Sequence, residues 1–170
     1  MIARKSALLV LALTLASWSV AGAQMPMGGT PPPPPAPFHL AINPTTLAGL
    51  PRKTLSVTDE NGHTNSYSGV SLDDLLVRAG APHGGPLRGK AMLAYVLITA
   101  ADGYHVLFTF SEIDASYTDH VVLIADTRDG VPFAADAGPY RLIVPFDKRD
   151  GRWVKQATAV DLQNASVPER

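Results

Sequence analysis

Cysteine is absent from this chain of 170 residues. Without a thiol, the protein forms no disulfide bond, holds no metal through thiolate ligands and has no cysteine nucleophile. Charged residues are scarce, at 17% of the chain against roughly 25% in soluble domains, and the formal net charge is -1. This composition excludes a generally basic nucleic-acid-binding protein and a charge-rich disordered chain, so no nucleic-acid partner is expected. The length suits one ordinary domain.

The longest apolar run lies at the N-terminus. Arg4 and Lys5 precede the apolar stretch 6–16, and the small residues Ala21-Gly22-Ala23 follow it. This order of basic, apolar and small-residue regions is typical of a secretory signal peptide. A membrane anchor is the alternative, but the stretch is shorter than the roughly 20 residues that span a bilayer. We therefore expect a signal peptide over residues 1–23, export to the periplasm, and no membrane span after cleavage.

Proline dominates the next segment, residues 24–37, which includes five consecutive prolines from Pro31 to Pro35. Proline has no backbone N–H and a fixed φ, so this run favours a stiff polyproline II spacer over a helix or a sheet. A tether explains the segment, and a ligand for proline-recognition modules is the alternative. The folded domain is expected over residues 38–163, followed by a polar tail over 164–170.

Strand patterns dominate the expected domain. The run at 91–99 is so apolar that we expect a strand buried on both faces, and the alternation after Gly103 places Tyr104 on one face with Val106 and Phe108. The pattern shows no regular alternation of strands with helices, so the predicted fold class is α+β, with a mixed, mainly β core and short helices. Strands are predicted over residues 40–42, 53–58, 63–67, 91–99, 104–110, 121–125, 140–145 and 153–162.

The clearest helix is predicted over residues 71–80. Ser71 is its N-cap and Gly80 its stop, and leucines at helical spacing form one apolar stripe. Asp73 and Asp74 lie at the positive end of the helix dipole. Capping explains this acidic pair, so we expect both carboxylates to be solvated and not to act as an acid–base couple.

The sequence shows neither a metal site nor a catalytic nucleophile. The histidines lie far apart, without the close spacing that metal ligands on one helix or strand have, and neither a G-x-S-x-G nor an S-x-x-K motif occurs. We therefore predict no metal ligands and no catalytic residues. The five histidines are His39, His63, His83, His105 and His120.

Positive charge is concentrated near the C-terminus. Five basic and two acidic residues give residues 141–155 a net charge of +3, whereas the chain as a whole carries -1. A local positive segment on an otherwise acidic body is suited to a phosphate or another small anion. A solvated turn between two strands is the alternative. The basic residues are Arg141, Lys148, Arg149, Arg152 and Lys155.

Five short motifs, in order, resemble the molybdopterin-binding domain of the sulfite oxidase family. The resemblance covers residues 55–163 and implies that family's fold. It also implies that Arg141 and Lys155, which match the family's cofactor-binding arginine and lysine, contact a phosphate-bearing pterin. Lys148, Arg149 and Arg152 are candidates for the same contact by proximity. The motifs are 67–76, 101–104, 123–132, 138–145 and 152–155.

In that family a cysteine thiolate upstream of the first motif holds molybdenum. The matching stretch, residues 57–62, has no thiol, and Thr58 or Asp59 would not replace soft thiolate ligation without different metal chemistry. The resemblance thus implies molybdopterin as the cofactor class, while molybdenum is not expected. We predict a non-catalytic binding protein for a small anion or a pterin-type ligand. The alternatives are an active molybdopterin-dependent oxidoreductase with a non-cysteine metal ligand, and an interaction subunit that contacts another envelope protein.

Overall fold

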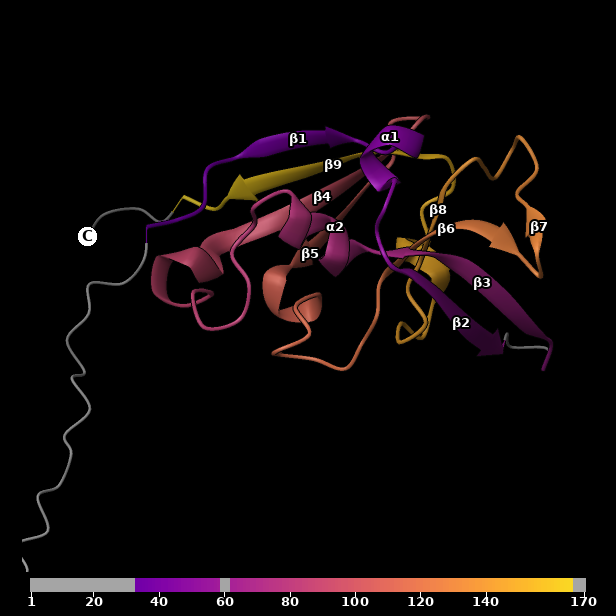
Figure 1. Cartoon of the computed structure of the whole chain (residues 1–170), viewed down its shortest axis with the longest axis horizontal. Coiled ribbons are helices and arrows are strands. Elements are labelled where there is room, and N and C mark those ends of the chain that lie inside the picture. The colour runs from indigo at the N-terminus through magenta and orange to yellow at the C-terminus, as the bar shows by residue number, and fades with distance from the viewer. Residues whose placement is uncertain (1–32, 59–61, 167–170) are drawn as a thin grey trace, which may run out of the picture. The chain divides into compact units, whose positions relative to one another are not determined.

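A computed structural model describes residues 33–58 and 62–166 of the chain. The predicted signal peptide, most of the predicted linker and most of the predicted turn at 59–62 lie outside the described residues. Two antiparallel sheets form the fold, with strand order β1-β9-β4-β5 in the first and β2-β3-β6-β7 in the second, where β8 also pairs with β6 (Figure 1). This confirms the prediction of a mainly β core with short helices.

The strands are β1 (Phe38–Ala41), β2 (Arg52–Thr58), β3 (Thr64–Ser71), β4 (Ala94–Ala100), β5 (His105–Thr109), β6 (Leu123–Arg128), β7 (Val131–Pro132), β8 (Arg141–Ile143) and β9 (Ala157–Asn164). The helices are α1 (Pro44–Leu47) and α2 (Leu72–Arg78), with the 3-10 helices η1 (Gly89–Leu93), η2 (Phe110–Glu112) and η3 (Asp150–Arg152).

The helix α2 forms where the sequence predicts it. Ser71 caps it by accepting a hydrogen bond from the Asp74 backbone N–H, at 3.1 Å. Leu72, Leu75 and Leu76 are buried in the same core as the inner side chains of the first sheet. The predicted apolar stripe is therefore confirmed, and it attaches the helix to the sheet by burial of leucine side chains.

The central strand of the first sheet differs from the prediction. Residues up to Leu93 form η1, and β4 begins only at Ala94. Along β4 fully buried residues such as Val96 and Ile98 alternate with half-buried ones. The prediction that this strand is buried on both faces was wrong, because an antiparallel sheet with one covered face buries only every second residue.

Two further strand predictions were wrong at their first residues. Tyr104 precedes β5 and is 51% exposed, while Val106 and Phe108 are buried as predicted. Trp153 precedes β9, which begins at Ala157 and ends one residue beyond the predicted domain end. There, Asn164 Nδ2 donates a hydrogen bond to the Pro35 carbonyl at 2.7 Å, so the described end of the proline-rich segment contacts the last strand.

The second sheet contributes side chains to two cores. Val70 and Ile124 belong to the main core, whereas Tyr67, Leu123 and Ala125 belong to a smaller one. Since successive side chains of a strand point to opposite faces, the smaller core lies on the sheet face that points away from the main core. Phe133 and Trp153 pack against this smaller core.

In the part of the chain that the structure describes, no helix combines the length and the apolar character needed to cross a membrane.

Candidate functional site

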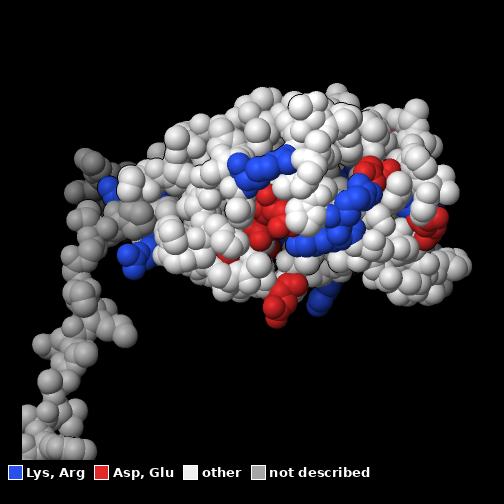
Figure 2. All heavy atoms as spheres, in the orientation of Figure 1, with Lys and Arg blue, Asp and Glu red and all other residues white. Residues whose placement is uncertain are grey.

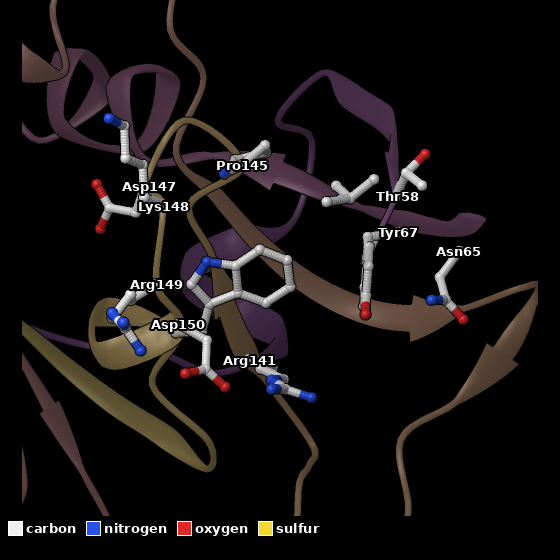
Figure 3. Close-up of a pocket in the computed structure, with 11 residues that line it drawn as sticks. Thr58, Asn65, Tyr67, Arg141, Pro145, Asp147, Lys148, Arg149 and Asp150 are labelled. Carbon is white, nitrogen blue, oxygen red and sulfur yellow. The ribbon is translucent and has the colours of Figure 1, made fainter. Parts of the chain in front are cut away.

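A cavity of about 360 Å³ opens next to the smaller core of the second sheet. In Figure 3 the residues of the loop after β8 lie on one side of it, Tyr67, Thr58 and Asn65 lie on the other, and Arg141 lies between them. Its lining residues are Val57, Thr58, Asn65, Tyr67, Arg141, Pro145, Asp147, Lys148, Arg149, Asp150 and Trp153.

Aromatic rings form a fixed wall of this cavity. Tyr67 is buried, stacks on Phe133 at 6.3 Å between ring centroids, and meets Trp153 edge-on at 5.7 Å. The indole Nε1 of Trp153 donates a hydrogen bond to the Val144 carbonyl at 2.9 Å. Aromatic side chains held on two sides in this way can offer a rigid apolar surface to a planar ligand.

Arg141 extends from β8, where it pairs with Ala125 of β6. Its guanidinium carbon lies 5.8 Å from the centroid of the Trp153 ring. The Nε of Arg141 is buried and has no hydrogen-bond partner, one of only two such side-chain atoms among residues 33–58 and 62–166. A buried N–H without an acceptor is unfavourable by the desolvation penalty of that group, about 1–3 kcal/mol. Arg141 also lines the cavity, so its guanidinium group is placed to contact an anion bound there.

Two further basic residues of the cavity carry unpaired charges. Lys148 and Arg149 are exposed, and neither has an ion pair with another residue that the structure describes. Some basic side chains in other parts of the molecule are paired, as Arg52 is with Asp126 at 2.7 Å, whereas others, such as Arg88 and Lys90, also have no ion pair with a described residue. Figure 2 shows basic and acidic side chains interspersed on one face of the molecule. What distinguishes the cavity is that its two unpaired basic residues lie in the same lining as Arg141.

Arg152 lies beside the cavity and not in its lining. Its Nε and Nη2 each donate to one carboxylate oxygen of Asp147 at 2.7 Å, and its Nη1 donates to Glu112 at 2.9 Å. The hydrogen bonds to Asp147 and Glu112 raise the pKa of Arg152 further above its ordinary value, although partial burial opposes the shift. All three nitrogens are thus occupied by the protein.

Of the five basic residues predicted to bind a ligand, the structure brings three together around the cavity: Arg141, Lys148 and Arg149. Arg152 contacts Asp147 and Glu112 instead. Lys155 is exposed and is not among the residues that line the cavity.

Sequence reasoning missed the aromatic wall and the contribution of β2. Tyr67 and Trp153 lie within two of the motifs, but nothing in their spacing shows that they meet. One signal could have indicated this wall. An aromatic residue lies close in sequence to each polar part of the lining: Tyr67 follows Asn65, and Trp153 follows Asp150.

A second group of titratable side chains lies around the start of α2. His83 Nδ1 is 3.4 Å from one oxygen of Asp73 and 3.4 Å from one oxygen of Asp114. Burial raises the pKa of Asp73, an effect that the nearby His83 only partly offsets. The prediction that Asp73 is solvated was wrong, because the His83 loop and the segment around Asp114 fold over it. Within the described ranges, no three metal-ligating side chains are placed so that they could hold a metal ion.

Comparisons with known proteins do not assign the chain to a family. No protein-family model matches the chain, and no match was found among curated proteins or among solved structures.

Proposed function

We propose that this protein is an exported, periplasmic domain of the sulfite-oxidase type that binds a small anion or a phosphate-bearing pterin-type ligand and does not catalyse a redox reaction. The observation that carries the proposal is the buried, unpartnered Nε of Arg141 beside a cavity with two unpaired basic residues. The resemblance of the five sequence motifs supports the same ligand class.

The chemistry of the lining fits an oxyanion. A guanidinium group offers N–H donors in a planar fork that matches two oxygens of a phosphate or sulfate, and hydrogen bonds between charged groups are about twice as strong as neutral ones. Lys148 and Arg149 add positive charge at the exposed rim. The rings of Tyr67 and Trp153 would contact a planar group attached to the anion.

The lining does not fit molybdenum bound as in the sulfite oxidase family. Two residues of the stretch that matches the family's cysteine, Val57 and Thr58, do line the cavity. They offer a methyl-bearing side chain and a hydroxyl group, and neither is the soft thiolate donor that this metal chemistry uses. We therefore propose no step that involves molybdenum.

Thermal unfolding in the presence of inorganic phosphate or sulfate tests the proposal. A ligand present at about 100 times its Kd stabilises the folded state by about 2.7 kcal/mol, so the melting temperature of the wild-type protein should rise with either anion. Arg141→Ala should lose this rise, and Arg141→Lys should recover only part of it because lysine lacks the guanidinium fork.

Arg88→Ala is the matched control, because Arg88 is exposed and lies outside the cavity lining. It should keep the full rise in melting temperature. An equal rise in wild-type, Arg141→Ala and Arg88→Ala proteins would show that the anions act on the protein non-specifically. Stoichiometric molybdenum in protein purified from its native envelope would contradict the non-catalytic part of the proposal.

A further inference from the structure

Arg152 is held by contacts with β5, with η2 and with Asp147 of the loop after β8, independently of any ligand. Its guanidinium carbon lies 4.4 Å from the centroid of the Phe108 ring of β5, and its Nη1 donates to Glu112 of η2. Burial alone would raise the pKa of Glu112, but hydrogen bonds from the Thr109 backbone N–H and from Arg152 outweigh it and hold that pKa below its ordinary value. Glu112 is thus a charged partner of Arg152 at neutral pH.

The second acidic partner of Arg152 is Asp147, which lines the cavity. Its side chain is only 18% exposed and lines the cavity directly before Lys148 and Arg149. A carboxylate in that place would repel an anion and would draw the two basic side chains toward itself. The bidentate pair with Arg152 directs both carboxylate oxygens to the guanidinium.

The charge of the cavity follows from this pairing. The charged residues of the lining are Arg141, Lys148 and Arg149 against Asp147 and Asp150. Adding Arg152 and its second partner, Glu112, leaves one net positive charge, and without Arg152 the sum would be zero. We infer that Arg152 is a positioning residue that keeps the cavity positive by pairing with Asp147, and that the cavity therefore prefers a divalent to a monovalent oxyanion. This inference rests on the proposed function and names the charge class of its ligand.

The test compares sulfate, which is divalent, with nitrate, which is monovalent, by isothermal titration calorimetry on the full mature chain. The wild-type protein should bind sulfate at least about tenfold more tightly than nitrate. Arg152→Gln should weaken sulfate binding by about tenfold or more, because it leaves the Asp147 charge uncompensated beside the ligand. Adding Asp147→Asn to that variant should restore the affinity to within about threefold of wild type.

The rescue separates a charge effect from a merely structural one. If Arg152 contacts the ligand directly, or only keeps the loop folded, the double variant will bind sulfate as weakly as Arg152→Gln, and the inference is overturned. Tyr104→Phe is the matched structural control, since it removes the hydrogen bond from Tyr104 to the Gly151 carbonyl without a change of charge. It should leave sulfate affinity within about threefold of wild type.

If Arg152→Gln does not fold, Asp147→Asn alone decides the question. It should bind sulfate more tightly than wild type, by about tenfold, because it leaves the positive charge of Arg152 without this partner beside the cavity. An unchanged affinity would mean that the charges of Asp147 and Arg152 do not act on the ligand, and would overturn the inference. Equal wild-type affinity for sulfate and nitrate would overturn the divalent class, whereas binding of neither anion by the wild-type protein would contradict the proposed function itself.

Discussion

Asp114 shows at the scale of one residue how this protein holds a buried charge. It is 1% exposed, and its carboxylate accepts hydrogen bonds from the Gly84 N–H at 2.6 Å and from the N–H and the hydroxyl of Ser116 at 2.7 and 2.6 Å. Burial alone would raise the pKa of Asp114, but these hydrogen bonds outweigh it and the pKa lies below its ordinary value. The ionised carboxylate therefore joins the loop around Gly84 to the segment after η2.

Asp114→Asn should lower the free energy of unfolding by about 1–3 kcal/mol at neutral pH, because the amide NH2 cannot accept a bond and one buried N–H loses its partner. Since the folded-state pKa is lowered, the wild-type advantage is present above the unfolded pKa of about 3.9 and is lost as pH falls through the folded value. Urea unfolding at several pH values measures both effects. Asp119→Asn, at an exposed position, should change stability by less than about 0.5 kcal/mol. A difference between Asp114→Asn and wild type that stays constant down to acid pH would contradict this account.

At the scale of the element, the contact between β3 and β6 depends on Gly69. A Cβ at this position would lie 2.0 Å from the Ile124 carbonyl oxygen and 2.6 Å from the Ala125 Cα. The register between these strands shifts at Ser68 and Gly69, which is an irregularity of the bulge kind. Only a residue without a side chain allows the two backbones to approach so closely, and β3 carries Tyr67 into the cavity.

Gly69→Ala should therefore lower the free energy of unfolding by about 2–4 kcal/mol, since neighbouring backbone must move to admit the methyl group. Gly85→Ala is the control, because a Cβ there has nothing within 4 Å. It should change stability by no more than about 0.5 kcal/mol. Denaturant unfolding of the two variants gives the comparison, and equal stability of both variants would mean that the strands can separate without penalty.

The sequence predicts an element well when the residues of that element alone determine it. It does not predict features that depend on what packs against the element. The cap at Ser71 and the leucine spacing define α2 by themselves. The Asp129-Gly130 pair likewise gives a two-residue hairpin between β6 and β7, with positive φ at both residues. The apolar run before Val96 carries no mark of where η1 ends, and nothing in it shows that only one face of the sheet is covered.

At the scale of the whole molecule, the cavity exists because sheet order brings distant segments together. Thr58 and Tyr67 of the first hairpin meet a loop more than half the domain later in sequence, around Arg149. The charge count could identify this loop as basic, but it could not separate Arg141, whose Nε is unpartnered, from Arg152, whose donors are occupied. That distinction depends on the positions of Asp147 and Glu112, which only the folded chain fixes.

The most direct test of the central claim is to observe the Nε–H of Arg141 by 15N NMR during a titration with phosphate. Arg141→Lys, which lacks this group, identifies the resonance by its disappearance. We expect the Arg141 Nε–H signal to shift strongly and saturably as phosphate accepts its hydrogen bond, with smaller shifts from Arg149. A signal that stays unchanged at saturating phosphate and sulfate would contradict the assignment of this cavity as an anion-binding site.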